Sequence, residues 1–437
     1  MYAIALLDAH GQLISTLEGV FDNASPLSCD VPTMAHIFQR AGYRTIACGK
    51  MHFVGPDQLH GFQERLTTDI YPADFVWTPA PWGSAQPTHL NYGKMIYSSY
   101  GISENNVQLQ YDYETHTAAL HRLMELAGDQ QPFFMLVSYS HPHSPFMIPG
   151  RYFQRYQHKN IPLPHIPDNF PECLDLYHQA IVRNYGYRDD IDPDILRKIR
   201  MAYYGMFSYV DEKVGELLKA LELIGKRENT IIIFCSDHGE MMGEKALFEK
   251  RSFFEDSLRV PLIIAHPDSR HREIDVPVSL VDFFPTLRDM LRLDWQTDQL
   301  DGASLTWAFN HPQQKMSHKP VIAEYFGEAI DFPFRAAIDA SMKYVSFPGS
   351  DYPERLYDLK RDPLELNDFA SDQDYKDDIL RFGKTLSNRF DYGRLKDKIM
   401  KSQQNRRLLK ALYTTHRPDW NYTPVYDASK KYHRGHI

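Results

Sequence analysis

The sequence predicts an α/β protein, with a mixed, mostly parallel sheet sandwiched by helices and a smaller carboxyl-terminal α+β part. Short apolar runs rich in β-branched residues, such as 230–234, are typical of strands buried on both faces. Amphipathic segments separate these runs, which favours helices packed on both faces of the sheet. After about residue 335 the pattern changes to closely spaced strands. We therefore expect two parts, residues 1–333 and residues 334–437.

In the first half of the chain, helix and strand signals alternate. Thr33 can cap a helix and Gly42 can end it, with apolar residues at helical spacing between them. Residues 55–106 are rich in Pro, Gly, Tyr and Trp without periodicity, which predicts a long functional loop. The expected elements are a helix over residues 33–41, a strand over 43–48, a strand over 132–140 and an amphipathic helix over 194–225.

The second half continues the alternation and then changes character. Residues 334–347 predict antiparallel strands, and a charged helix and an aromatic tail follow them. The expected elements are strands over residues 230–235, 260–265 and 321–325, a helix over 279–291, strands over 334–347, a helix over 372–389 and a tail over 413–437.

Composition excludes several classes of protein. The chain has 437 residues, of which 43% are hydrophobic and 24% charged, as in ordinary globular proteins. A net charge of −9 argues against nucleic acid as a partner, and no apolar run is long enough to span a membrane. Four cysteines do not make a disulfide framework. We therefore expect a cytoplasmic protein in a reducing compartment.

A candidate metal site follows the strand over residues 230–235. The strand ends on Asp237-His238-Gly239, and ligands of α/β proteins bind just beyond the carboxyl ends of strands. A carboxylate suits Ca²⁺, and an adjacent imidazole admits Mn²⁺. We therefore predict Asp237 and His238 as ligands of a divalent metal, Ca²⁺ or Mn²⁺. The alternative is a simple strand-end turn in which Asp237 caps a helix.

Residues 237–264, which include Arg259-Val260-Pro261, resemble the sulfatases of the alkaline phosphatase superfamily. Within that family, residues 67–79 and 420–429 are similar to choline sulfatases, and phosphonate monoester hydrolases are related. The resemblance implies an alkaline phosphatase/sulfatase-like fold and a sulfuric ester hydrolase that acts on a small-molecule sulfate ester, choline O-sulfate. It also implies a divalent metal, a formylglycine nucleophile and a homo-oligomer.

The resemblance assigns catalytic roles to four residues. Lys50, in Gly-Lys-Met-His, would bridge the nucleophile and the sulfate oxygens, and His52 would hydrogen-bond one oxygen. His143 would contact the sulfate or the leaving group, with His141 as the weaker candidate, and Lys250 would act as general acid. Without the resemblance, each of these residues could equally be a surface lysine or a structural histidine.

The resemblance also indicates a pocket for the choline group. Aromatic faces and a carboxylate bind quaternary ammonium ions. The candidates for substrate binding are Trp77 and Trp82 in the predicted loop and Asp427 in the aromatic tail.

One part of the family pattern is missing from the sequence. Sulfatases oxidise the first residue of Cys-x-Pro-x-Arg or Ser-x-Pro-x-Arg to formylglycine, and neither motif occurs here. Residues 11–13 and 19–23 resemble the segment just after the nucleophile helix, which places the nucleophile at or before Met1. We therefore expect an amino-terminally truncated sulfatase whose 1–333 domain lacks its first strand.

Such a chain would have an open sheet edge and would not hydrolyse sulfate esters by itself, since it lacks the covalent step. Two other functions stay open. One is a phosphonate or phosphate monoester hydrolase, because the same scaffold handles both kinds of anion. The other is a non-catalytic anion-binding protein or oligomerisation partner.

Overall fold

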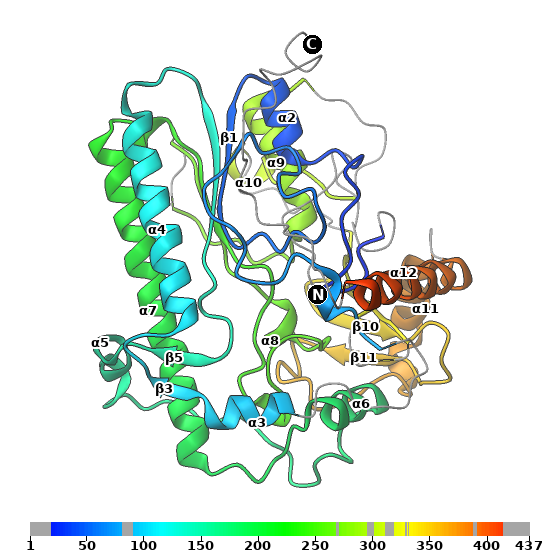
Figure 1. Ribbon diagram of the computed structural model, residues 1–437. Helices are drawn as coiled ribbons and strands as arrows, with labels where there is room; N and C mark the ends of the chain where they lie inside the picture. Colours follow the sequence, from blue (N-terminus) through cyan, green and yellow to red (C-terminus); the bar gives the residue numbers. More distant parts are fainter. Residues whose placement is uncertain are drawn as a thin grey trace.

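The computed structural model describes most of the chain as one α/β assembly with a second, antiparallel sheet (Figure 1). The described residues are 19–80, 91–267, 271–294, 301–310, 319–327, 330, 332–387 and 391–413.

Three parallel strands form the interior of the α/β part. Their order is β2 (Glu64–Arg65), β1 (Arg44–Gly49) and β4 (Phe133–Ser138), and β1 is parallel to both neighbours. Five of the six β1 residues are buried, as expected for a strand that is paired on both edges and covered on both faces. The predicted strands over residues 43–48 and 132–140 are thereby confirmed.

A separate pair of strands continues the same layer. β6 (Ile232–Cys235) pairs with β7 (Leu262–Ala265), and the pairing is antiparallel, so the sheet is mixed as predicted. The same helices cover β4 and β6. On one face, Phe133 of β4 and Ile232 of β6 belong to a hydrophobic cluster with residues of α7 (Pro193–Leu223).

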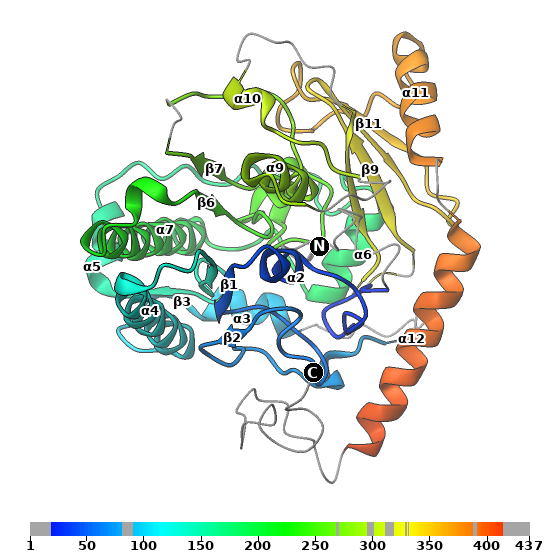
Figure 2. The same cartoon turned by 90° about the horizontal axis from the view of Figure 1, so that it is seen from above.

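On the other face, β4 and β6 pack against α2 (Met34–Arg40) and α9 (Phe283–Leu291), through Phe134 and Ile233. Figure 2 shows α7 and α4 on one side of this layer and α2 and α9 on the other. The predicted helices over residues 33–41, 194–225 and 279–291 are therefore confirmed. The longest of them, α7, begins where Asp192 accepts a hydrogen bond from the Asp194 amide and Pro193 takes the first position.

An open edge lies between these two groups of strands. Within the described residues, no strand pairs with the second edge of β4 or with the second edge of β6. Every β4 residue and the first three β6 residues are partly exposed, although helices cover both faces. Within the described residues, β4 and β6 therefore each have one unpaired edge.

The carboxyl-terminal part is a four-stranded antiparallel sheet, in the order β11-β10-β9-β8. The prediction for residues 321–325 was wrong in one respect: this strand, β8, joins the antiparallel sheet. A short connection between β8 and β9 favours antiparallel pairing, so this sheet crosses the boundary expected between residues 333 and 334. Its strands are β8 (Val321–Tyr325), β9 (Phe334–Ile338), β10 (Met342–Ser346) and β11 (Arg355–Asp358).

Four of the described helices with eight or more residues were not predicted. One, α3 (Asn91–Ser98), lies inside the segment predicted to be a loop, and its Ile96 and Tyr97 are buried in the largest core cluster. Tertiary packing therefore decides this helix. The other three are α4 (Val107–Glu125), α6 (Leu176–Tyr185) and α12 (Tyr392–Leu412). The last of these has almost no apolar stripe, which is the signal that sequence patterns need.

The remaining elements are short, apart from α11 (Lys376–Ser387), which confirms the charged helix predicted over residues 372–389 and packs on the antiparallel sheet. The short elements are η1 (Phe75–Trp77), β3 (Tyr100–Ile102), η2 (Leu126–Gly128), β5 (Phe146–Ile148), α5 (Gly150–Phe153), η3 (Gln154–Tyr156), η4 (Arg227–Asn229), η5 (Glu244–Ala246), α8 (Glu255–Leu258), η6 (Leu280–Asp282), α10 (Trp307–Asn310) and η7 (Gln373–Tyr375).

The helix α12 ties the carboxyl-terminal part back to the beginning of the described chain. Arg406 makes a buried bidentate ion pair with Asp22, at 2.7 and 2.8 Å. Lys410 donates to the carbonyl oxygen of Val76 in η1, at 2.6 Å. This helix therefore supports two loops that border the candidate site.

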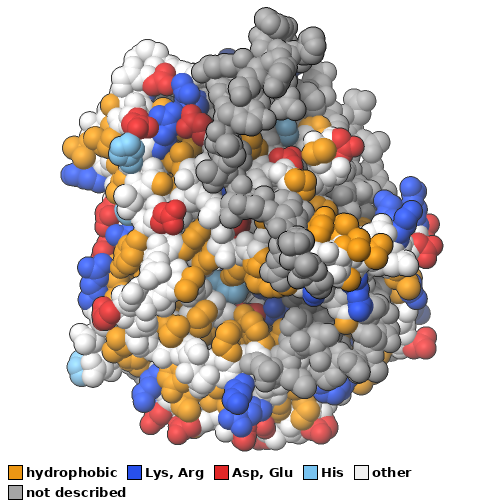
Figure 3. Space-filling model, viewed as in Figure 1, with side chains coloured by type: hydrophobic (Ala, Val, Ile, Leu, Met, Phe, Trp, Pro, Cys, Tyr) orange, Lys and Arg blue, Asp and Glu red, His pale blue; other side chains and the backbone are white. Residues whose placement is uncertain are grey.

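The surface agrees with the composition. On the face seen in Figure 3, basic and acidic side chains are intermixed toward the edges, and hydrophobic side chains gather across the middle. Among the described residues, no helix combines the length and the apolar character needed to cross a membrane.

Candidate active site

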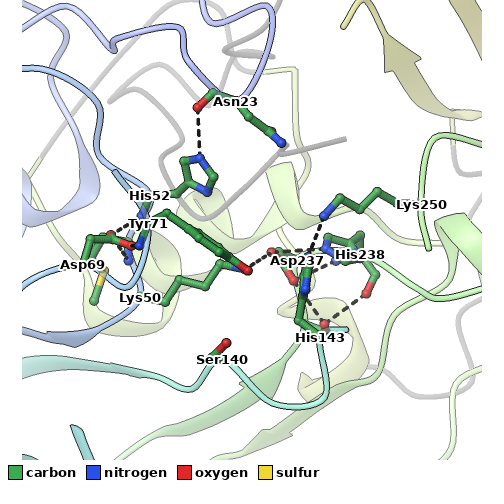
Figure 4. Close-up of polar contacts among 12 residues, drawn as sticks. Asn23, Lys50, His52, Asp69, Tyr71, Ser140, His143, Asp237, His238 and Lys250 are labelled. Carbon is green, nitrogen blue, oxygen red and sulfur yellow. Dashed lines mark hydrogen bonds and ion pairs between the residues drawn. The ribbon is translucent and has the colours of Figure 1, made fainter. Parts of the chain in front are cut away.

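Three strand ends bring the predicted polar residues together. Lys50 follows β1, His143 follows β4, and Asp237 follows β6. Because these strands run in one layer, their carboxyl ends meet at one edge of the sheet. Figure 4 shows these three side chains pointing toward one region, with His238 and Lys250 beside them.

Lys50 is a buried cation at the centre of this region. Its Nζ lies 3.7 Å from Oδ2 of Asp237 and 5.3 Å from the centre of the Tyr71 ring. Burial acts to lower the pKa of Lys50, but the fields of Asp237, Tyr71 and Asp69 outweigh it, so the pKa is raised. Lys50 is therefore a fixed positive charge at neutral pH.

Asp237 and His238 direct lone pairs to one place. The His238 Nδ1–H donates to the carbonyl oxygen of Gly239 at 2.8 Å, which leaves Nε2 as the acceptor nitrogen. That nitrogen lies 3.7 Å from Oδ2 of Asp237. Burial favours the neutral carboxyl, but His238, Lys50 and Lys250 together hold the pKa of Asp237 well below its usual range. Burial likewise holds the pKa of His238 well below its ordinary value.

His143 and Lys250 form the opposite wall. The His143 Nδ1–H donates to the carbonyl oxygen of Ser144 at 2.8 Å, so Nε2 accepts from Nζ of Lys250, 3.0 Å away. Burial and the two nearby lysines, Lys250 and Lys50, lower the pKa of His143 to about 3. Burial, opposed by Glu249 and assisted by Arg251 and Lys50, lowers the pKa of Lys250 to about 8.

The expectation for His52 needs a correction. The sequence suggested an extended segment with Lys50 and His52 on one side, but His52 has a left-handed backbone, with φ of 58°. Its Nε2–H donates to the carbonyl oxygen of Asn23 at 3.0 Å, so the ring turns toward Asn23 (Figure 4). Asp69 fixes this turn, because its Oδ2 accepts hydrogen bonds from the amides of Met51 and His52. Burial and Lys50 lower the pKa of His52 to about 4.

The sum of these charges favours an anion. At neutral pH the region holds two ammonium groups, from Lys50 and Lys250, one carboxylate, from Asp237, and three neutral imidazoles. The net charge is therefore positive in a buried place, where charge–charge interactions are stronger than in water. The arrangement can neutralise the oxygens of a tetrahedral anion.

Aromatic rings border the region on one side. Tyr71 lies with its ring centre 5.2 Å from His52, 4.9 Å from Trp77 and 6.0 Å from His143. Trp77 is 40% exposed, which leaves part of its ring available at the rim. Trp82 and Asp427, the other predicted substrate-binding residues, lie outside the described residues.

The sequence missed the residues that hold this region in place. Asp112 of α4 accepts hydrogen bonds from the amides of Ser140 and His141 and from Nδ1 of His141, at 2.6 to 3.1 Å. Gln108 of α4 donates to the carbonyl oxygens of His143 and Ser144. Without the prediction of α4 there was no signal for them, whereas Tyr71 lies in the segment 67–79 that the sequence did single out. His141 is bonded to Asp112 and so has a structural role, which suits the weaker of the two histidine candidates.

The described residues do not complete a metal site. Oδ2 of Asp237 and Nε2 of His238 suit one side of a divalent ion, but no group of three or more His, Cys, Asp or Glu residues in the described ranges could enclose it. The ammonium of Lys50 also lies against the same carboxylate oxygen. The fit to a metal is therefore incomplete.

The large cavity of the described structure lies elsewhere. It has a volume of about 1910 Å³ and lies between β7 and β8, lined by Leu262 and Ile322 among others. Of the predicted catalytic and metal-binding residues, only Asp237 lines it. We therefore place the candidate site by its converging polar groups and not by this cavity.

Comparison with known proteins agrees with this geometry. The sulfatase family model matches residues 11–293, which include β1, β4, β6 and the residues that follow them. The chain belongs to the sulfatase family. Two further models match, the carboxyl-terminal domain of N-sulphoglucosamine sulphohydrolase over residues 243–390 and the carboxyl terminus of the choline sulfatase enzyme over residues 397–437.

Individual proteins give the same family. A choline-sulfatase of Rhizobium meliloti is 36% identical to this sulfatase. The aligned region covers 98% of the chain and 85% of the relative. An arylsulfatase of Clostridium perfringens is 28% identical over 81% of the chain and 77% of the relative. The crystal structure of a phosphonate monoester hydrolase of Agrobacterium radiobacter matches with a TM-score of 0.67 and 26% identity, over 87% of the chain and 84% of that structure. The alkaline phosphatase-like sulfatase fold is thereby confirmed.

Proposed function

We propose that this sulfatase binds the sulfuryl group of a sulfate ester between Lys50, His143 and Lys250. The observation that supports this most directly is the convergence of two buried ammonium groups from distant segments on one place at the strand ends. Charge-assisted hydrogen bonds from such groups are the strongest that proteins offer to an oxyanion. The reaction that we propose for this site, where a nucleophile is supplied to it, is the family's hydrolysis of a sulfuric ester, with choline O-sulfate as substrate and choline and sulfate as products.

Each residue has a role that its environment suits. Lys50 neutralises the sulfate oxygens, because its charge persists at all physiological pH values. Lys250, with a pKa of about 8, is placed to give a proton to the leaving oxygen near neutral pH. His143, neutral and hydrogen-bonded to Lys250, orients that ammonium group. The His52 ring lies 5.2 Å from the Tyr71 ring and supports Tyr71 at the border of the site.

Two groups of the family's chemistry are not carried by the described residues. In sulfatases a formylglycine supplies the nucleophile and a divalent metal activates it, and Asp237 with His238 would hold one side of a Ca²⁺ or Mn²⁺ ion. The 437-residue sequence contains neither formylglycine motif. We therefore expect this chain by itself to bind sulfate without hydrolysing an ester.

The proposal for choline rests on the aromatic rim and on similarity. Tyr71 and Trp77 offer ring faces beside the anion site, and a quaternary ammonium binds to such faces. The choline-sulfatase relative and the match over residues 397–437 support the same substrate. Trp82 and Asp427 are proposed as further contacts to choline. Assembly into a homo-oligomer is a further part of this proposal.

A phosphonate or phosphate monoester is the second candidate substrate. The structural match to a phosphonate monoester hydrolase favours it, since both anions are tetrahedral and would use the same two ammonium groups. A non-catalytic anion-binding protein or oligomerisation partner is the third candidate, favoured by the missing nucleophile motif.

Calorimetric titration of the whole chain separates these candidates. We would titrate inorganic sulfate, choline O-sulfate and methylphosphonate, each with and without Mn²⁺ or Ca²⁺. Tighter binding of choline O-sulfate than of sulfate supports the choline proposal, and preference for methylphosphonate supports the second. Release of sulfate from choline O-sulfate by this chain would contradict the expected lack of turnover. Absence of any sulfate binding would refute the proposed site.

A further inference from the structure

A buried glutamate connects the two loops of the anion site. Glu249 is 1% exposed, and its Oε1 accepts hydrogen bonds from the hydroxyl of Tyr92 and, at 2.5 Å, from Oγ of Ser144. Its Oε2 forms an ion pair with Arg251. The carboxylate is thus shared among three segments that are far apart in the sequence.

The position of these contacts in the chain is significant. Ser144 directly follows His143, and Glu249 directly precedes Lys250. One carboxylate therefore links the loop that carries His143, through the Ser144 hydroxyl, to the loop that carries Lys250. Nζ of Lys250 and Nε2 of His143, which these two loops carry, lie 3.0 Å apart. This contact borders the proposed anion site.

The local backbone makes this connection necessary. Glu249 and Arg251 both have left-handed backbones, with φ of 62° and 84°, which non-glycine residues adopt at a cost. Such a conformation persists only where other contacts hold it. Here the contacts are the Glu249 carboxylate and a hydrogen bond from the Glu249 amide to Oε1 of Glu240, at 2.5 Å.

We propose that Glu249 is a positioning residue of the anion site, which aims Lys250 and His143 at the same sulfate group. The inference rests on the proposed sulfate binding and adds to it a residue that touches no substrate. Its charge has a second effect, because it favours the protonated form of Lys250. The charged and titratable groups around Lys250 include Glu249, Arg251, Lys50, Asp237, His143, His238, His52 and Glu240.

The test compares three variants of the whole chain. Glu249→Gln keeps an oxygen for Ser144 but presents an amide to Arg251, and we expect inorganic sulfate to bind about tenfold more weakly. Ser144→Ala removes one contact without changing any charge, so we expect a smaller loss with the same pH dependence. Glu365→Gln is the matched control, because Glu365 is also buried, has φ of 55° and pairs with buried Lys343 outside the site.

A second measurement separates the positioning role from simple destabilisation. NMR titration of lysine side chains, with Lys250 assigned through Lys250→Arg, should give a midpoint at lower pH in Glu249→Gln than in the unmodified chain. Glu365→Gln should lose stability and leave both sulfate affinity and this midpoint unchanged. Equal sulfate affinity and equal midpoints in Glu249→Gln and the unmodified chain would overturn the inference.

The outcomes also distinguish this inference from the proposed function. If the unmodified chain fails to bind sulfate, the proposed function fails and this inference fails with it. If the unmodified chain binds sulfate and Glu249→Gln binds it equally well, only the inference fails. If Glu365→Gln weakens sulfate binding as much as Glu249→Gln does, the effect is one of general stability and the inference is wrong.

Discussion

The two halves of the candidate site differ in how well the described residues complete them. The cationic half, with Lys50, His143 and Lys250, is enclosed and held by several segments of the chain. The other half offers Asp237 and His238, and no described third ligand closes a metal site. The described residues thus form the cationic half that the proposed anion binding needs, whereas a metal would need ligands beyond this pair.

The difference also has a physical basis in the fold. The cationic half is positioned by β1, which is paired on both edges, and by α4, whose Gln108 fixes the loop after β4. The metal half follows β6, which, like β4, is paired on one edge only among the described residues, and it has no partner equivalent to β1. Support on several sides keeps polar groups at fixed distances, and this is what an anion site requires.

Removal of a cation from the complete half should have the largest effect on anion binding. Lys50→Met should weaken the binding of inorganic sulfate about 100-fold, or ~3 kcal/mol, because a charged hydrogen-bond donor is lost from a buried place. Titration calorimetry measures the change. Lys343→Met removes another fully buried lysine, which pairs with Glu255 and Glu365 and not with the site residues, and should cost stability without altering sulfate affinity. Similar losses in both variants would contradict the assignment.

The second prediction concerns pH. Sulfate requires Lys250 in its protonated form, and the pKa of Lys250 is about 8, so affinity should stay level below pH 8 and fall by up to about tenfold for each pH unit above it. Lys50 does not contribute to this fall, because its pKa is raised. In Lys250→Arg the guanidinium does not titrate, so the fall should disappear. A profile that is the same in both proteins would show that another group is responsible.

The third prediction addresses the incomplete half. Without metal, the Asp237 carboxylate repels an anion, so Asp237→Asn should bind sulfate more tightly, by less than about tenfold in a polar site. The measurement is calorimetry in the presence of a chelator. Added Mn²⁺ or Ca²⁺ should change sulfate binding in the unmodified chain and not in the variant. Weaker metal-free binding by Asp237→Asn would mean that Asp237 acts mainly by holding Lys50 in place.

The smallest expected effect lies at the rim. Trp77→Ala should weaken the binding of choline O-sulfate by about two- to fivefold, the value of a cation–π contact at a partly exposed site. Binding of inorganic sulfate should not change, because Trp77 is separated from the lysines by Tyr71. Equal effects on both ligands would place Trp77 in the structure of the site and not in choline recognition.

Much of the site could be predicted because its residues follow strands directly. Lys50, His143 and Asp237 come just after runs whose apolar pattern marks them as strands, and the sheet brings such ends together. Asp112 and Gln108 could not be predicted in the same way, since they lie on a helix face and act through the backbone of another segment. The turn of His52 toward Asn23 depends on a left-handed backbone that the sequence pattern does not encode.

The family, the α/β class and the polar residue types that gather at the strand ends follow from the sequence alone, because hydrophobic period and short motifs are local properties of the chain. Only the tertiary structure decided that β8 joins the antiparallel sheet, that α3 is helical and that Glu249 ties His143 to Lys250. These features depend on contacts between residues far apart in sequence, and burial then sets the charge state of each group.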